Sequence, residues 1–190
     1  LDFSPPVGVL WVCWAILAGI LLLALLVPES PPVEHPHEAL PIGRILKQPR
    51  VIALMASSFA MSAAHGALYV FYSIHLTDNG YSKTDLGLLW SLGVVAEIIV
   101  FMLMPRLCRH FTLRALLLAS FAVAVVRFVM IGWGVASLWV AFTAQLMHGM
   151  TFGAHHAASI ASVNQWFPGR AQGRGQALYS VLGYGLSGVA

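Results

Sequence analysis

Two ionisable residues lie deep inside apolar stretches of this sequence, where a charge could serve proton or anion chemistry. Glu97 sits a little past the middle of Leu86–Met104, a segment that is otherwise apolar apart from Ser91. Arg127 lies in the next apolar segment, Ala115–Trp133. A charged group surrounded by hydrocarbon is costly, so it usually faces a partner, a cavity or a pathway. We therefore expect the function of the chain to involve this pair.

The two residues admit more than one role. A carboxyl group can carry a proton, and a guanidinium group that approaches it changes its proton affinity. Glu97 and Arg127 are thus predicted to be the proton-coupling residues. Arg127 is also a candidate to bind the carboxylate of a solute, because guanidinium and carboxylate groups form strong charged hydrogen bonds. The alternative is a permanent Glu97–Arg127 pair that only holds the helices together.

Polar and aromatic side chains recur at steps of three and four residues, which keeps them on one face of a helix. One such stripe runs through the predicted helix 51–76, a second through 138–162, and a third surrounds Glu97. Such groups can bond across helix contacts, but three stripes together favour a shared cavity. The predicted substrate-binding residues are His65, Tyr69, Tyr72, Trp90, Arg127, Gln145, His148 and His155.

Motifs for enzymatic chemistry are missing from the sequence. His148 and the adjacent His155 and His156 are too far apart for the tight histidine boxes of a two-metal membrane oxygenase. The sequence contains no nucleophile motif, no phosphate-binding loop and no GxSxG. We predict no catalytic residue, no metal site and no cofactor, and hence no enzyme.

The composition indicates a membrane protein. Hydrophobic residues make up 59% of the sequence and charged residues 9%, against roughly 25% charged residues in a soluble domain. Although the pI is about 9.1, so few charges cannot form a basic face for nucleic acid. The expected surroundings are a lipid bilayer, which an apolar helix of about 20 residues can cross.

The apolar segments predict an all-α, polytopic membrane helix bundle. A first helix lies within residues 1–27, and a proline-rich linker follows at 28–50. Further helices are predicted at 51–76, 86–104, 115–133, 138–162 and 177–190, with a short basic turn at Pro105–Arg114. The last of these helices is incomplete, and the first residue is not Met. We therefore expect the sequence to be truncated at both ends.

Lys and Arg residues alternate in number along the successive connections. There are three in the linker at 28–50, one before residue 86, three between 105 and 114, none near residue 135, and two between 164 and 176. Because basic residues are enriched on cytoplasmic loops, this alternation predicts that the 28–50 linker is cytoplasmic.

Several stretches resemble a known family. HGALYVFYSIHLTDNGYSKTDLGLLWSLGVVAEIIVF is similar to the seventh and eighth helices of the phenylpropionate-permease-like branch of the major facilitator superfamily. VVRFVMIG, QLMHGMTFGAHHAA and RGQALYS resemble its ninth helix, its tenth helix and the start of its eleventh helix. The similarity runs from about Pro41 to the end of the sequence.

This resemblance implies a twelve-helix carrier built from two six-helix halves. Residues 1–27 would be the last helix of the N-terminal half, 28–50 the linker between the halves, and 51–190 the C-terminal bundle. The missing N-terminal half would complete the binding site. Such a carrier would bring a small organic solute, with an aromatic or other organic acid as one option, across the inner membrane of a bacterium together with protons.

Two alternatives remain open from the sequence. The first is a carrier of the same fold that works by facilitated diffusion or exchange. The second is a membrane sensor or assembly protein that does not transport.

Overall fold

The structure, a computed structural model, describes residues 6–26 and 42–185, and the chain in these ranges is helical apart from short turns. It divides into two units, Leu1–His35 and Pro36–Ala190. The first contains α1 (Pro6–Leu25). No strand occurs in the described ranges, so the prediction of an all-α helix bundle is confirmed. The second unit contains α2 (Ile42–Leu46), α3 (Pro49–Asp78), α4 (Lys83–His110), α5 (Leu113–Gly134), α6 (Leu138–Leu146), η1 (Gly149–Ala154), α7 (His155–Trp166), α8 (Ala171–Ser180) and η2 (Val181–Gly185).

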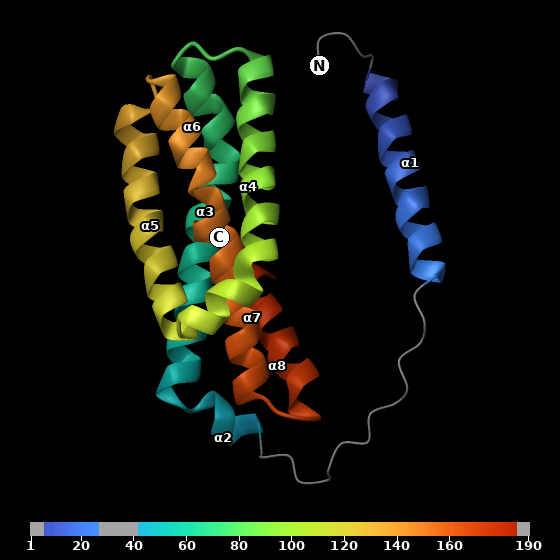
Figure 1. Ribbon diagram of the computed structural model, residues 1–190, viewed down its shortest axis with the longest axis vertical. Coiled ribbons are helices and arrows are strands. Elements are labelled where there is room, and N and C mark those ends of the chain that lie inside the picture. The colour runs from blue at the N-terminus through green and yellow to red at the C-terminus, as the bar shows by residue number, and fades with distance from the viewer. Residues whose placement is uncertain (1–5, 27–41, 186–190) are drawn as a thin grey trace. The chain divides into compact units, whose positions relative to one another are not determined.

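Helices α3, α4 and α5 are each long and apolar enough to cross a membrane. Figure 1 shows them running side by side with α6 along the length of the bundle. The span predicted at 138–162 is built from α6, the π-helical segment η1 and α7. Met147 and His148, between α6 and η1, keep helical backbone angles. Most of the predicted linker, 28–41, and the last residues, 186–190, lie outside the described residues.

The basic turn predicted at Pro105–Arg114 is mostly helix in the structure. Helix α4 continues through Pro105 to His110, and only Phe111 and Thr112 separate it from α5. A proline removes one backbone donor, and membrane helices tolerate that loss. The cations at the end of α4 suit the negative end of its dipole. Thr112 then starts α5, because its hydroxyl accepts a hydrogen bond from Ala115 N at 3.1 Å.

The unit that contains α2 to η2 is apolar outside and polar within. On α4, large apolar side chains such as Ile98 and Met102 are exposed. Along α3, Ser58 and His65 are buried between two apolar clusters, one around Met55 and the other around Leu68. Soluble proteins show the opposite arrangement. The outer surface therefore suits contact with lipid, and the polar interior contains the site described next.

Candidate functional site

Arg127 lies on the buried face of α5 and is fully enclosed, with 0% of its surface exposed. Its Nε donates a hydrogen bond to the carbonyl oxygen of Ala144 at 2.8 Å. Nη1 donates to Thr151 Oγ1 at 3.2 Å and to His65 Nε2, also at 3.2 Å. Nη2 donates to Gln145 Oε1 at 3.4 Å. All four acceptors are uncharged, so within the described residues this buried cation has no carboxylate partner.

The tautomer of His65 follows from its two hydrogen bonds. Its Nδ1 lies 2.9 Å from the carbonyl oxygen of Met61, and a carbonyl oxygen can only accept. Nδ1 therefore carries the hydrogen, and Nε2 is free to accept from Arg127. The Thr151 hydroxyl lies 3.3 Å from the same Nε2 and 3.3 Å from the carbonyl oxygen of His148. His65 and Thr151 thus hold the guanidinium group from two helices.

Glu97 does not contact the Arg127 guanidinium directly, and its nearest charged or polar neighbour towards Arg127 is His148. Its Oε2 lies 3.8 Å from His148 Nε2, which is close enough for charge attraction but too long for a hydrogen bond. The His148 ring lies 5.7 Å from the ring of His65. No ion pair joins Glu97 to Arg127 in the described part of the chain. We call Arg127, His65, Gln145, His148 and Thr151 the Arg127 cluster, with Glu97 at its edge.

Glycines allow α4 to approach η1 closely beside Glu97. A Cβ atom on Gly149 would lie 2.5 Å from the carbonyl oxygen of Ala96, and one on Gly153 would lie 3.2 Å from Glu97 Cγ. On α4 itself, a Cβ on Gly93 would lie 3.0 Å from Gln145 Oε1. Small residues at such spacing bring membrane helices together. Backbone contact therefore places Glu97 next to His148.

Aromatic rings line one side of the Arg127 cluster. The Trp90 ring lies 5.6 Å from that of Tyr69 and 5.4 Å from that of Tyr72. Its Nε1 donates to Ser73 Oγ at 3.1 Å, which orients the indole. The Tyr69 ring in turn lies 6.2 Å from that of His65. Because Tyr69 is 43% exposed, this aromatic wall has an accessible face.

Three buried polar atoms of the site make no hydrogen bond within the described residues. They are Gln145 Nε2, Tyr72 Oη and His148 Nδ1, on side chains that are at most 5% exposed. Buried polar groups are normally paired, so each such group calls for an explanation. The Gln145 amide nitrogen and the Tyr72 hydroxyl are donors, and Gln145 also accepts a hydrogen bond from Arg127. The site therefore offers donors and a cation together, the groups that bind a carboxylate.

Comparison with known proteins identifies the family. Residues 2–190 match the model described as "MFS_1 like family". The chain belongs to this family. A "Probable 3-phenylpropionic acid transporter" of Escherichia coli (strain K12) is 38% identical over 127 residues, which cover 67% of this chain and 33% of that protein. No solved structure matches. The predicted resemblance to the phenylpropionate-permease-like branch of the major facilitator superfamily is thereby confirmed.

Membership in this transporter family has two consequences. The chain is an integral membrane protein, and it is classed with carriers and not with enzymes. It spans about a third of the length of the curated relative, at 33%. The activity of the complete protein is accordingly taken up as a proposal below.

The structure brings together most of the residues predicted for the site. His65, Gln145 and His148 belong to the Arg127 cluster, and Tyr69, Tyr72 and Trp90 form the aromatic wall beside it. His155 lies elsewhere: it is buried with its ring 5.2 Å from that of Phe121. No hydrogen bond or ring contact among the described residues joins it to the cluster.

Thr151 is the member of the Arg127 cluster that the sequence reasoning missed. It is fully buried and accepts a hydrogen bond from Arg127. Its position three residues after His148 places it on the same side of the helix, which is the signal that could have found it. Phe152, which follows His148 on the polar and aromatic stripe of the predicted helix 138–162, stacks its ring 5.5 Å from that of His148.

Proposed function

We propose that this chain supplies half of the solute site of a proton-coupled secondary carrier, which transports an aromatic acid by alternating access. The observation that supports this most is the fully buried Arg127, which has neutral acceptors on every side and no carboxylate within the described residues. A buried charge without a counter-ion is costly. An anionic solute would supply the missing charge, and a neutral solute would not.

The solute carboxylate would bind at Nη2 of Arg127. The contact of Nη2 with Gln145 Oε1, at 3.4 Å, is the longest that this guanidinium makes and the easiest to exchange. If Gln145 turned aside, its Nε2 could donate to the incoming carboxylate. Tyr72, whose hydroxyl makes no hydrogen bond within the described residues, would offer that hydroxyl. Nε of Arg127 would stay on Ala144 O and keep the side chain in place.

The aromatic part of the solute would lie against Tyr69 and Trp90. Their rings are 5.6 Å apart and tilted by 41°, and Tyr69 is partly exposed. A third ring placed there would gain edge and stacking contacts. The name of the E. coli relative specifies 3-phenylpropionic acid, which combines one benzene ring with one carboxylate. We adopt this chemistry as the first substrate class to test.

The transported proton would bind at Glu97. Its side chain is 20% exposed, and Oε2 lies 3.8 Å from His148 Nε2. His148 lies beside His65, and His65 accepts from Arg127. Charge changes at Glu97 would therefore reach Arg127 through two imidazole rings. Solute binding at Arg127 would in this way alter the proton affinity of Glu97, which is the coupling that symport requires.

In the complete carrier, residues 51–190 would form the C-terminal bundle and 28–50 the cytoplasmic connection between two halves. Residues 1–27 would be the last helix of the N-terminal half. That half would line the solute site from the side opposite the Arg127 cluster. The basic residues near positions 44, 109 and 170 would face the cytoplasm of a bacterium. This arrangement is the one that alternating access between two halves needs.

Uptake by the complete carrier in proteoliposomes tests the proposal. With 3-phenylpropionate outside, an inward proton gradient should drive accumulation above the outside concentration, and a proton ionophore should abolish the accumulation. Equilibration without accumulation would replace symport by facilitated diffusion or exchange. If no solute of any class binds in a broad thermal-shift screen of the complete protein, a sensor or assembly role is favoured instead.

A further inference from the structure

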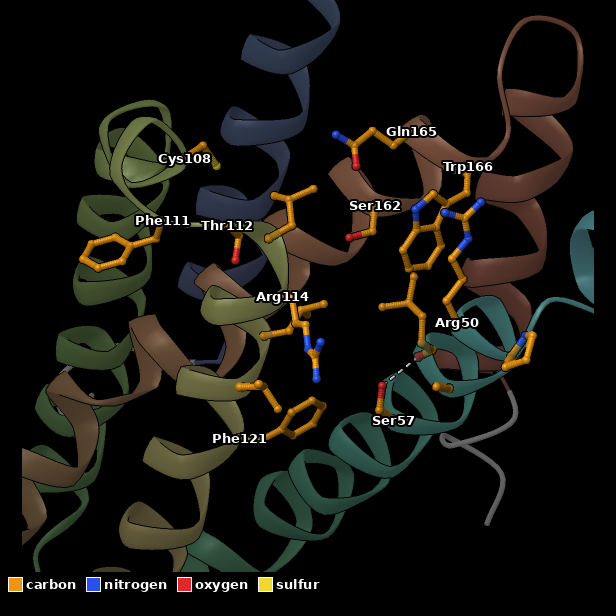
Figure 2. Close-up of a pocket in the computed structure, with 16 residues that line it drawn as sticks. Arg50, Ser57, Cys108, Phe111, Thr112, Arg114, Phe121, Ser162, Gln165 and Trp166 are labelled. Carbon is orange, nitrogen blue, oxygen red and sulfur yellow. Dashed lines mark hydrogen bonds between the residues drawn. The ribbon is translucent and has the colours of Figure 1, made fainter.

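A cavity lies at the end of the bundle where α3 and α5 begin and α7 ends. Its volume is about 950 Å³, and it is lined by residues of α3, α5 and α7 with Cys108 at the end of α4. Figure 2 shows the 16 side chains that line it. None of them belongs to the Arg127 cluster or the aromatic wall. We call this cavity the basic-end pocket.

Two arginines enter the basic-end pocket from different helices. Figure 2 shows Arg50 on α3 and Arg114 on α5, with the space of the pocket between them. Arg50 is held in place, because its Nε donates to Gln48 Oε1 at 2.8 Å and its guanidinium lies 5.2 Å from the Trp166 ring. Arg114 makes no hydrogen bond or ion pair within the described residues. None of the described residues that line the pocket is Asp or Glu.

Apolar side chains make up much of the rest of the pocket lining. Leu113, Leu117 and Phe121 continue along α5, and Leu54 faces them from α3. Leu118, also on the lining, is 58% exposed, so this apolar part reaches the surface that faces lipid. Trp166 is of the residue type that gathers where hydrocarbon meets headgroups. A groove that combines two cations with apolar side chains is a site for an anionic amphiphile.

We propose that the basic-end pocket binds one anionic phospholipid. Its phosphate lies between Arg50 and Arg114, and an acyl chain follows Leu117 and Phe121 into the bilayer. Charge complementarity selects this occupant: two guanidinium groups with no lining carboxylate favour an anionic headgroup over a zwitterionic one. Basic pockets between membrane helices bind acidic headgroups for this reason. The lipid thereby fastens α5 to α3, whose ends line opposite sides of the pocket.

Native mass spectrometry of the complete carrier tests this binding. The protein is taken from nanodiscs of phosphatidylcholine that contain phosphatidylglycerol, and retained lipid is counted against added lipid. Each arginine near an anionic headgroup should contribute about fivefold to the affinity. The double variant Arg50→Ala/Arg114→Ala should therefore lose about twentyfold to thirtyfold in phosphatidylglycerol affinity. Arg114→Lys should retain most of the binding, because a point charge remains.

The matched control is Arg106→Ala/Arg109→Ala. These arginines lie near the same end of α4 but line a different surface hollow. The proposal holds if phosphatidylglycerol affinity drops only in the Arg50/Arg114 variant and phosphatidylcholine binding is unchanged in both. It is overturned if both variants lose phosphatidylglycerol equally, or if millimolar inorganic phosphate displaces the lipid. It is also overturned if another helix of the carrier fills the pocket, in which case neither variant changes lipid retention.

Discussion

The Arg127 cluster and the basic-end pocket both place arginine beside aromatic rings, yet they differ in what satisfies the charge. Arg127 is fully buried, donates to four acceptors and lies 5.9 Å from the Phe128 ring. Arg114 is exposed and makes no hydrogen bond within the described residues. In the first region the protein fixes the cation before any solute arrives. In the second region the cation is left for the surroundings to neutralise.

This difference suggests two kinds of recognition within one bundle. A guanidinium that is fixed beforehand loses little side-chain entropy when an anion binds, which favours selectivity. An exposed, hydrated guanidinium such as that of Arg114 attracts anionic headgroups mainly by charge, with lower demands on shape. We therefore expect substitutions in the Arg127 cluster to change transport and substitutions in the basic-end pocket to change lipid binding. The predictions below test this division in order of decreasing effect.

The largest expected effect is the difference in thiol labelling between the two ends of the bundle. One end should face the outside of the cell and the other the cytoplasm, so each position is either labelled or not labelled. Single cysteines at positions 83 and 109 are introduced into the complete carrier with the native cysteines removed. An impermeant thiol reagent applied to intact cells should label the Lys83→Cys variant and leave Arg109→Cys unlabelled. Labelling of position 109 alone would reverse the orientation and place the basic-end pocket in the outer leaflet.

Replacement of Arg127 should give the next largest effect. Arg127→Gln removes the buried charge and should weaken binding of an aromatic acid by about 2–5 kcal/mol, a loss of roughly thirtyfold or more. Arg127→Lys keeps a point charge but loses the fork of donors that reaches Ala144, Thr151 and Gln145, so its loss should be smaller. Calorimetric titration with 3-phenylpropionate measures both. Equal and mild losses would leave Arg127 as a packing residue.

Glu97→Gln should separate coupling from binding. The amide keeps the size of the side chain beside His148 but cannot exchange a proton. We expect accumulation driven by the proton gradient to fail, while exchange of labelled for unlabelled solute continues. Both are measured in the same proteoliposomes. Accumulation with unchanged pH dependence in this variant would remove Glu97 from the coupling mechanism.

Gly149→Ala should destabilise the bundle while leaving Arg127, Arg50 and Arg114 unchanged. The added Cβ would lie 2.5 Å from Ala96 O and would force α4 away from η1, at a cost of about 1–3 kcal/mol. The control is Gly132→Ala on α5, where a Cβ meets nothing within 4 Å. Thermal unfolding of the complete carrier in detergent should show a lower Tm for the first variant only. An equal Tm in both would mean that the helices separate more easily than the contact distance implies.

Trp90→Phe should have the smallest effect. It keeps an aromatic ring beside Tyr69 and Tyr72 and removes the hydrogen bond to Ser73. The expected loss in solute affinity is about 0.5–1.5 kcal/mol. Trp90→Leu, which removes the ring, should lose more, and competition binding against labelled solute ranks the two. If Trp90→Phe and Trp90→Leu lose the same affinity, the indole acts only through Ser73.

Sequence reasoning predicted the helical bundle and its family, and it singled out Glu97 and Arg127, whose roles stay predictions. It could do so because burial of a charge in an apolar span is visible in the sequence itself. Whether Glu97 and Arg127 contact each other could not be predicted. Residue spacing shows which residues share one face of a helix, but it does not show which faces of two helices pack together. His148 lies between them only because Gly149 and Gly153 let η1 approach α4.

Two further differences have local causes. A proline inside an apolar run resembles a helix end, but α4 continues through Pro105 to His110, because a membrane helix tolerates the loss of one backbone donor. The stripe that included His148 and His155 assumed α-helical spacing throughout. The π-helical turn in η1 breaks that spacing between His148 and His155, and His155 packs on Phe121 instead of on the Arg127 cluster.

The π-helical winding of η1 also has a mechanical consequence. A π turn holds about one residue more than an α turn, and conversion of η1 to α-helical winding would rotate α7 against α6 by roughly 100°. Thr151 and Gly153 both lie in this segment. The same rotation would therefore move the Thr151 hydroxyl away from Arg127 and Gly153 away from Glu97. A change of winding in η1 would thus rotate α7 relative to α6 within one membrane span, without a hinge loop between them.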